Sequence, residues 1–335
     1  AGDIAQCGID EDEETAKLLD NIPGTVYTVG DNAYPNGTDA EFNNCYEPTW
    51  GRHKARTYPA VGDNEYNSSS VAAGHFNYYG AAAGNQNEGY YSYDVGSWHI
   101  IVLNSNCSKI GGCGPNDPQG QWLQADLAAN PRACTLAIHH EPLFSSNGGD
   151  IDLRDFWVPL YAAGTDIVLS GHRHNYERFA QQNPDGTADP GRGIRQFVVG
   201  TGGSNLSSFG VISPNSEARN DNTHGVLKLT LHPTSYDWEF IPIAGQTFTD
   251  SGSANCVLPA GTGSLPTAVD DAATTPEDTP VTIDVAANDT DPDGNLNAAS
   301  ANTDCLTCGL PANGSLGNNG DGTFTYTPSG GFTGS

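Results

Sequence analysis

The chain has 335 residues, enough for one large domain and one small one. Its 40 acidic residues outnumber its 13 basic ones, and the formal net charge of −27 excludes the basic surface that nucleic-acid binders need and argues against docking on an anionic membrane. No apolar run approaches the roughly 20 residues that span a bilayer, so we expect no membrane insertion.

Short apolar runs alternate with helical patterns over residues 1–256, which predicts an α/β layered fold. We expect helices at 11–20, 119–129 and 153–163. The first begins with four acidic residues, which suits a helix N-terminus, and the third ends at Gly164, a typical C-cap. We expect strands at 25–30, 57–61, 90–95, 99–104, 134–139, 165–169 and 196–199. The runs at 225–231 and 236–243 flank a His-Pro-Thr-Ser turn and predict a hairpin.

The composition changes near Val257. From residue 258 onward there are 10 acidic residues and no Lys or Arg, so this part carries −10 of the net charge. The segment at 258–266 is rich in Pro and Gly and is typical of a linker. Short β-type runs follow it. We therefore expect a domain over 1–257, a linker over 258–266, and a small all-β sandwich module over 267–335 that stops mid-pattern and is incomplete.

The chain has eight cysteines and no Met, and we expect a processed or truncated product. Cys305 and Cys308 form the only CxxC, which excludes a zinc ribbon. An even count in an acidic chain favours disulfides and an oxidising compartment, so we expect a secreted or cell-surface protein. The pairs that the sequence suggests in the first domain, without fixing the connectivity, are Cys107 with Cys113, Cys7 with Cys45, and Cys134 with Cys256.

Four apolar runs each end in side chains that bind metals. Asp31, Asp63 and His140 follow the first three, His172 and His174 follow the fourth, and Gly2-Asp3 looks like the stub of a fifth such turn. A single Gly-Asp is usually only a turn, and a single His is often a core residue. Five such turns at strand ends favour a shared site, because the carboxyl ends of strands meet at one edge of a sheet. Asp and His together suit zinc, iron or manganese better than calcium.

At these residues the chain resembles the calcineurin-like metallophosphoesterases. The matching blocks are Gly2-Asp3, Gly30-Asp-Asn-Ala-Tyr34, Gly62-Asp-Asn-Glu65, His140-Glu-Pro142 and Gly171-His-Arg-His174. Tyr34 and the following Asn175-Tyr-Glu-Arg178 narrow the resemblance to the purple acid phosphatase-like branch. It covers residues 1–256 and implies a four-layer αββα sandwich built on two sheets.

The resemblance also implies a ligand set for two metal ions. One ion would take Asp3, Asp31, Tyr34 and His174. The other would take Asp31, Asp63, His140 and His172, with Asp31 as the bridge. The Tyr34 phenolate favours Fe(III) at the first position, with Zn, Mn or Fe at the second.

The second block departs from the family pattern, which is Gly-Asn-His-Asp/Glu. Asp63 and Asn64 stand at the middle positions, and Asn64 cannot supply a proton at neutral pH. The loop after His140-Glu-Pro also lacks the second histidine that the family leads us to expect. His139 is the nearest replacement, but strand alternation points it away from His140. Arg52, His53 and His75 lie in predicted loops from which they could reach a substrate; the alternative is that they are surface residues.

The tail resembles bacterial cadherin-like or Ig-like surface repeats through 268–280 and 287–294. Asp289, Asp291 and Asp293 alternate before Gly294 and could bind calcium. The other interpretation, which the sequence leaves open, is a solvated turn. Such a module suggests cell-surface or extracellular assembly.

Taken with the residues, the resemblance implies a secreted phosphomonoesterase. A metal-bound hydroxide would attack the phosphate ester, with Asp31 and His140 at the catalytic centre and Asn64 hydrogen-bonded to the phosphate. Arg52 and His53 are further candidates for substrate contact. The alternative is a cell-surface binding or structural protein that keeps the fold with weak or no turnover, since the family's additional histidines are missing.

Overall fold

The computed structural model describes residues 1–257, 267–290, 296, 298, 301 and 311–334. By its internal contacts the chain divides into two units, Ala1–Ala260 and Gly261–Ser335. The helices of the first unit are α1 (Glu11–Asp20), α2 (Asp39–Glu41), α3 (Ala73–Tyr79), α4 (Pro118–Ala129) and α5 (Arg154–Ala162). Its strands, in chain order, are β1 (Ala5–Gln6), β2 (Val26–Val29), β3 (Ala33–Tyr34), β4 (Thr57–Ala60), β5 (Tyr91–Val95), β6 (Trp98–Val102), β7 (Cys134–Ile138), β8 (Ile167–Ser170), β9 (Tyr176–Phe179), β10 (Arg195–Val199), β11 (Ser216–Asn220), β12 (Gly225–Leu231), β13 (Ser235–Pro242) and β14 (Ser251–Asn255).

A seven-stranded sheet forms the centre of the first unit, in the order β11-β9-β10-β8-β7-β6-β5. Its four middle strands, β10, β8, β7 and β6, run parallel, as expected where strands alternate with helices. A second group of strands comprises the parallel pair β2-β4 and the antiparallel β12-β13-β14. The predicted hairpin is present as β12 and β13.

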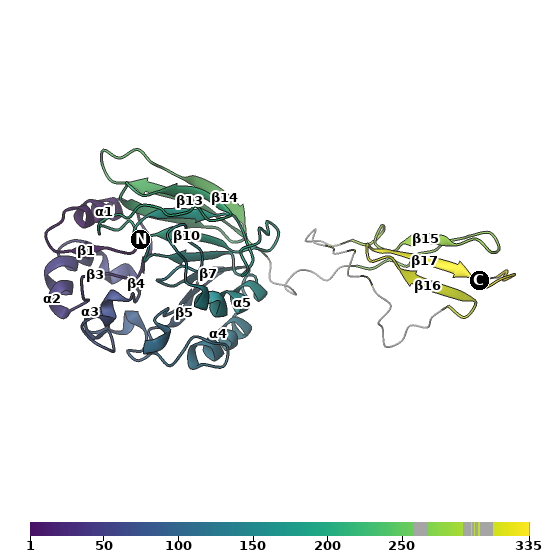
Figure 1. Ribbon diagram of the computed structural model, residues 1–335, viewed down its shortest axis with the longest axis horizontal. Helices are drawn as coiled ribbons and strands as arrows, with labels where there is room; N and C mark the ends of the chain where they lie inside the picture. The colour runs from purple at the N-terminus through teal and green to yellow at the C-terminus, as the bar shows by residue number, and fades with distance from the viewer. Residues whose placement is uncertain (258–266, 291–295, 297, 299–300, 302–310, 335) are drawn as a thin grey trace. The chain divides into compact units, whose positions relative to one another are not determined.

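Three buried apolar clusters separate four layers. One lies between the seven-stranded sheet and the second group of strands, and includes Trp98, Phe197 and Phe240. Another packs α4 and α5 on the outer face of the large sheet, through Leu123 and Trp157. In Figure 1 the strands β13 and β14 lie on one side of the large sheet, and α4 and α5 lie on the other. The layers are therefore helix, strand, strand and helix.

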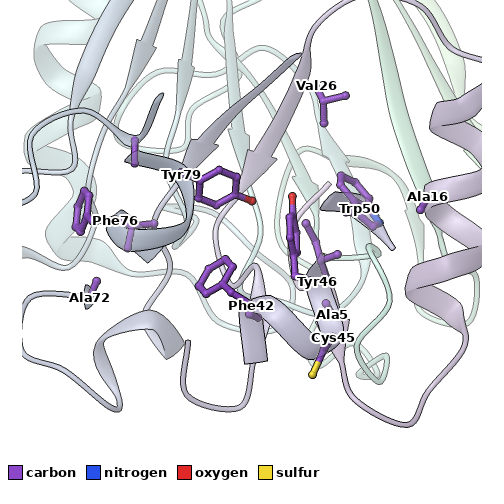
Figure 2. Close-up of a cluster of buried hydrophobic side chains, with 14 of the residues drawn as sticks. Ala5, Ala16, Val26, Phe42, Cys45, Tyr46, Trp50, Ala72, Phe76 and Tyr79 are labelled. Atoms are coloured by element: carbon purple, nitrogen blue, oxygen red, sulfur yellow. The ribbon is translucent and has the colours of Figure 1, made fainter. Parts of the chain in front are cut away.

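The third cluster covers the face of β2 with α1, α3 and the turns between them. Figure 2 shows its aromatic side chains, among which the rings of Phe42, Tyr46 and Tyr79 lie close together. Phe42 and Tyr46 belong to a π-helical segment, Phe42–Tyr46, which follows α2 directly. Trp50 begins a 3₁₀ segment, Trp50–Arg56, and its indole N–H donates to Thr15 Oγ1 on α1 at 3.0 Å.

The predicted helices are present, with ends that differ by at most one residue: α1 covers 11–20, α4 begins one residue early, and α5 is one residue shorter at each end. The region at 39–80, for which no helix was predicted, contains α2, α3 and several short π and 3₁₀ turns. Strands β9, β11 and β14 were also not predicted. β11 and β14 are short and largely polar, whereas β9 is only four residues long and buries Tyr176 and Phe179.

Disulfides are present in the first unit, as predicted, and they join Cys7 to Cys45, Cys107 to Cys113 and Cys134 to Cys256. The last of these closes a loop with a sequence separation of 122 residues and fixes the end of the unit to the beginning of β7. Cys305 and Cys308 lie outside the described residues.

The second unit contains an antiparallel sheet in the order β15-β17-β16, formed by Val281–Asp284, Thr323–Pro328 and Gly314–Asn318. Asp289 accepts a hydrogen bond from the Val269 backbone N–H at 2.8 Å. Asp291 and Asp293, the other two calcium candidates, lie outside the described residues. Within the described parts of both units, no helix has the length and apolar character needed to cross a membrane.

Candidate metal centre

Strand pairing places the predicted metal ligands just beyond corresponding strand ends. In the parallel pair β2-β4, Val29 pairs with Ala60, so Asp31 and Asp63 both lie just beyond the same end. In the parallel pair β7-β8, Ile138 pairs with Leu169, which places His140 and His172 just beyond the corresponding end. Asp3 joins them because its backbone N–H donates to the Gly30 carbonyl at 3.1 Å.

The turns that carry these ligands have unusual backbone conformations. Asp3, Asp31 and His172 have φ values of 57°, 50° and 64°, in the left-handed region that non-glycine residues seldom adopt. Such strain is typical of functional sites. The preceding glycines allow close approach: a Cβ at Gly62 would lie 2.1 Å from Asp31 Oδ1, and one at Gly171 would lie 2.6 Å from Asp3 Oδ2.

One group of side chains converges on the Tyr34 hydroxyl. That hydroxyl lies 2.8 Å from Asp3 Oδ1, 2.8 Å from Asp31 Oδ2 and 3.0 Å from His174 Nε2. These are the four residues that the resemblance assigned to the first ion. All are buried or half-buried, and their polar atoms lie within hydrogen-bonding distance of the Tyr34 hydroxyl.

A second group converges on Asp63. Its Oδ1 lies 3.0 Å from His140 Nε2 and 2.9 Å from His172 Nδ1, and His140 Nε2 lies 3.3 Å from Asp31 Oδ1. These are the four residues that the resemblance assigned to the second ion. Asp31 therefore belongs to both groups, one oxygen facing each, as a bridging carboxylate would.

Contacts with the main chain orient two of the histidines. His140 Nδ1 lies 2.8 Å from the Val29 carbonyl and His174 Nδ1 lies 2.7 Å from the Asn205 carbonyl. In each ring Nδ1–H donates, which leaves the Nε2 lone pair directed at the aspartates, the arrangement common among metal-binding histidines. His172 instead presents Nδ1, and its backbone N–H donates to Asp3 Oδ2 at 2.9 Å.

The buried Glu65 supports two of the turns in the cluster, a role that was not predicted from the sequence. Its fully buried carboxylate accepts hydrogen bonds of 2.7 to 3.2 Å from the backbone N–H groups of Asp31, Asn32, Ala33 and Gly62. It therefore fixes the turn after β2 and the turn after β4 with one side chain. Glu65 belongs to the Gly62-Asp-Asn-Glu65 block that resembles the family, but the sequence pattern does not predict these contacts.

The charge of the cluster fits cations. Asp3 and Asp31 are buried, and carboxylates buried together are costly unless they are paired with positive charge. Burial alone would raise the pKa of Asp63, but hydrogen bonds to His140 and His172 outweigh it and hold the pKa well below its usual range. Against the effect of burial, Asp3 raises the pKa of His174 to about 9. A donor set of carboxylate, imidazole and phenol suits two iron, zinc or manganese ions.

Besides the candidate ligands His140, His172 and His174, the described residues around the cluster provide no histidine that could donate a proton to a leaving group. Asn64 donates from Nδ2 to Asp31 Oδ2 at 2.9 Å, and its own Oδ1 accepts from Asn67 at 2.7 Å. His139 is fully buried and faces the other way, with Nδ1 2.6 Å from the Glu141 carbonyl, and burial lowers its pKa to about 4. In the hydrogen bonds of the described cluster, the only histidines are His140, His172 and His174.

The structure does not bring Arg52, His53 or His75 to the cluster. Arg52 pairs with Glu13 and Asp20 of α1 at 2.6 and 2.9 Å, and His53 lies 3.1 Å from Asp20. His75 is on α3, not in a loop, and it packs against Phe42, Phe76 and Tyr79 in the core. The prediction that these residues could reach a substrate overlooked the acidic residues of α1 and the aromatic cluster, which already bind them.

The curated proteins most similar to this chain include plant purple acid phosphatases. The chain is 30% identical over 230 residues to purple acid phosphatase 18 of Arabidopsis thaliana, covering 61% of this chain and 49% of that protein. It is 35% identical over 157 residues to purple acid phosphatase 22 of the same plant, covering 42% of this chain and 34% of that protein. The chain thus spans at most about half the length of these relatives.

Solved structures share the fold. A purple acid phosphatase from yellow lupin seeds superposes with a TM-score of 0.58 at 19% identity, covering 73% of this chain and 48% of that one. GAP50, described as the anchor in the inner membrane complex of Plasmodium, gives 0.57 at 15% identity, covering 76% and 87%. The predicted metallophosphoesterase fold is therefore confirmed. Residues 264–335 match the family described as a bacterial Ig domain, which confirms the Ig-like module.

Proposed function

We propose that this chain, which joins a metallophosphoesterase fold to a bacterial Ig domain, is a secreted enzyme that hydrolyses phosphate monoesters with two metal ions. The observation that carries the proposal is the pair of four-residue groups that share Asp31. The likeness to plant purple acid phosphatases supports a phosphatase activity. The three disulfides support an oxidising compartment outside the cytoplasm.

Asp3, Asp31, Tyr34 and His174 would hold one ion, and Asp31, Asp63, His140 and His172 the other. When bound, such ions would supply a water-derived nucleophile at neutral pH and would neutralise the charge on the phosphate oxygens. We assign Fe(III) to the Tyr34 side, because a hard trivalent ion best stabilises a phenolate. Zinc, manganese or iron would suit the side with two histidines.

The chain's own residues contribute mainly by positioning the substrate, and less by transferring protons. Asp63, His172 and His174 have side chains that are 39%, 25% and 24% exposed, so the substrate phosphate approaches from their side of the cluster. Asn64 lies beside Asp31 there, and its amide can turn to donate to a phosphate oxygen. Since Asn64 and the buried His139 cannot donate a proton at the described cluster, the departing alcohol would take its proton from solvent.

The direct test is hydrolysis of p-nitrophenyl phosphate by the full chain after loading with iron, zinc or manganese. The control is His172→Ala, which removes one ligand from the open side. We expect turnover in the first protein and a loss of at least about 100-fold in the second. Equal rates in the two proteins would sink the enzymatic proposal.

If iron is the ion at Tyr34, the loaded protein is violet and Tyr34→Phe bleaches it.

A second candidate function is a binding or structural role with weak or no turnover. The absence of any histidine besides His140, His172 and His174 at the described cluster favours it, and so does the structural likeness to an anchor protein. In this case the chain retains its metals but shows no turnover above the His172→Ala control. The Ig module would then mediate assembly at a cell surface.

Calcium binding near Asp289, Asp291 and Asp293 stays a prediction, checked by calcium-dependent protease resistance.

A further inference from the structure

The loop at 205–213 borders the open side of the candidate metal centre. The Asn205 carbonyl accepts from His174 Nδ1, and the Ser207 backbone N–H donates to the His174 carbonyl at 2.8 Å. His174 is one of the three ligands whose side chains are partly exposed. The loop therefore begins in direct contact with a residue that a bound substrate approaches.

A second loop holds the 205–213 loop in place. The Gly210 N–H donates to the Ser146 carbonyl at 2.9 Å, and the Ser213 N–H donates to Ser146 Oγ at 2.8 Å. The buried Glu177 accepts from the Ser146 N–H at 2.8 Å and from Ser216 Oγ at 2.6 Å, which ties both loops to the strands beneath. These contacts use backbone and serine groups, and none uses an apolar side chain of the 205–213 loop.

The apolar side chains of the 205–213 loop are turned outward. Val211 is 91% exposed, the highest value for a large apolar side chain among the described residues, and its neighbour Ile212 is 42% exposed. Leu206 and Phe209 are half-buried. One exposed apolar side chain is ordinary on a protein surface, but a run of them on a loop fixed to a candidate ligand is more typical of a binding surface.

The charge of the chain restricts what such a surface can bind. A net charge of −27 repels substrates that carry several phosphates or carboxylates beyond the group held by the metals. An ester whose alcohol part is uncharged avoids that repulsion. If the alcohol part is also apolar, contact with exposed apolar side chains such as Val211 and Ile212 would be favourable.

We propose that the 205–213 loop binds the alcohol part of the substrate and selects phosphate monoesters of uncharged aryl or alkyl alcohols over polar or multiply charged ones. The inference rests on the proposed phosphatase function and adds the class of ester to it. Val211 and Ile212 act as specificity residues, whereas Glu177 and Ser146 position the loop that carries them.

The test compares phenyl phosphate with glycerol phosphate as substrates of the metal-loaded full chain. We expect a higher kcat/KM for phenyl phosphate, and we expect the double change Val211→Ser and Ile212→Ser to lower the ratio of the two kcat/KM values about fivefold through lost apolar contact. The matched control is Val158→Ser, since Val158 is also 42% exposed but lies on α5. This control should leave the ratio unchanged.

A binding measurement separates this inference from the proposed function. Phenylphosphonate and methylphosphonate cannot be hydrolysed, so their Kd values on the metal-loaded protein report the loop without turnover. We expect tighter binding of phenylphosphonate and a loss of that preference in the double variant. If neither ester is hydrolysed, the phosphatase proposal fails, and the phosphonate ratio still decides the role of the loop. An unchanged ratio in the double variant overturns the inference even if the enzyme is active.

Discussion

The two units of the chain organise their charged groups in opposite ways. In the first unit, carboxylates such as Asp3, Asp31 and Glu65 are fully buried, and backbone N–H groups or histidines contact each of them. In the second unit, ten acidic residues have no Lys or Arg beside them, and Phe324 is the only buried apolar side chain among those described. Buried charge requires a large core around it, whereas exposed charge does not.

Among the changes that test this contrast, Glu65→Ala should have the largest effect on stability. It leaves four buried N–H groups without an acceptor, so we expect the free energy of unfolding to fall by about 4 kcal/mol or more. Metal retention should fall as well, because both turns lose their common support. Denaturant titration and elemental analysis measure the two effects. The control is Glu277→Ala in the second unit, where the side chain is exposed and little should change.

The next effect concerns the covalent closure of the first unit. Replacing both Cys134 and Cys256 with Ala should lower the free energy of unfolding by about 2–5 kcal/mol, because the denatured chain regains the freedom of a long loop. The matched control replaces Cys107 and Cys113, whose separation is only six residues. Thermal or denaturant unfolding compares them, and an equal loss in both would contradict the loop-length argument.

A smaller effect should depend on pH. His99 is buried between Asp94 and Asp126, at 2.9 and 2.8 Å, and Arg132 also contacts Asp94. Burial would lower the pKa of His99, but Asp126 and Asp94 outweigh it and raise the pKa. A raised pKa means that the stabilisation is complete below the unfolded-state pKa of about 6.5 and is lost as pH rises through the higher folded-state pKa.

We therefore expect His99→Gln to destabilise the chain by about 1–2 kcal/mol at pH 5.5 and by less at pH 9. Unfolding at the two pH values provides the measurement. His232→Gln is the control, since His232 makes a comparable contact with Asp237 at the surface, where such pairs contribute little. A larger loss at pH 9 than at pH 5.5 would show that His99 acts as a neutral hydrogen-bonding group.

The smallest effect is expected from removing the second unit. Deleting 261–335 keeps Val257, whose backbone N–H donates to the buried Asp166, and it removes no residue of the metal centre. Phosphatase activity and metal content should change by less than about twofold, because the centre lies wholly within the core of the first unit. Loss of the transition metals on truncation would show that the units depend on each other.

The positions of the candidate ligands at strand ends were predictable because they depend on short-range patterns. A strand followed by Gly-Asp or Gly-His places a side chain at the carboxyl end of a sheet, and Asp31, Asp63 and His172 follow this rule. His140 reaches the same end two residues after its strand, without a preceding glycine. The pairing of Cys107 with Cys113 was suggested by proximity in sequence. These features required no knowledge of how distant segments pack.

The features that were missed depend on contacts between distant segments. Glu65 supports residues that lie more than 30 positions away, and the Asn205 carbonyl binds a histidine 31 positions away. The segment at 39–80 contains short π and 3₁₀ turns, from which Phe42, Tyr46 and Trp50 pack into a core formed with distant residues. Arg52 and His53 were misplaced because their partners, Glu13 and Asp20, belong to a different element.

The Cys134–Cys256 bond has a mechanical consequence. Tension applied through the second unit would enter the first unit at Cys256 and cross directly to Cys134 at the beginning of β7. The residues between them form a covalently closed loop that such a pull cannot extend, and His140, His172 and His174 all lie within it. Asp3, Asp31, Tyr34 and Asp63 precede Cys134 in the chain. Under a load between Cys256 and the beginning of the chain, the candidate imidazole ligands would therefore be shielded, and the candidate oxygen ligands would be the first to separate from the cluster.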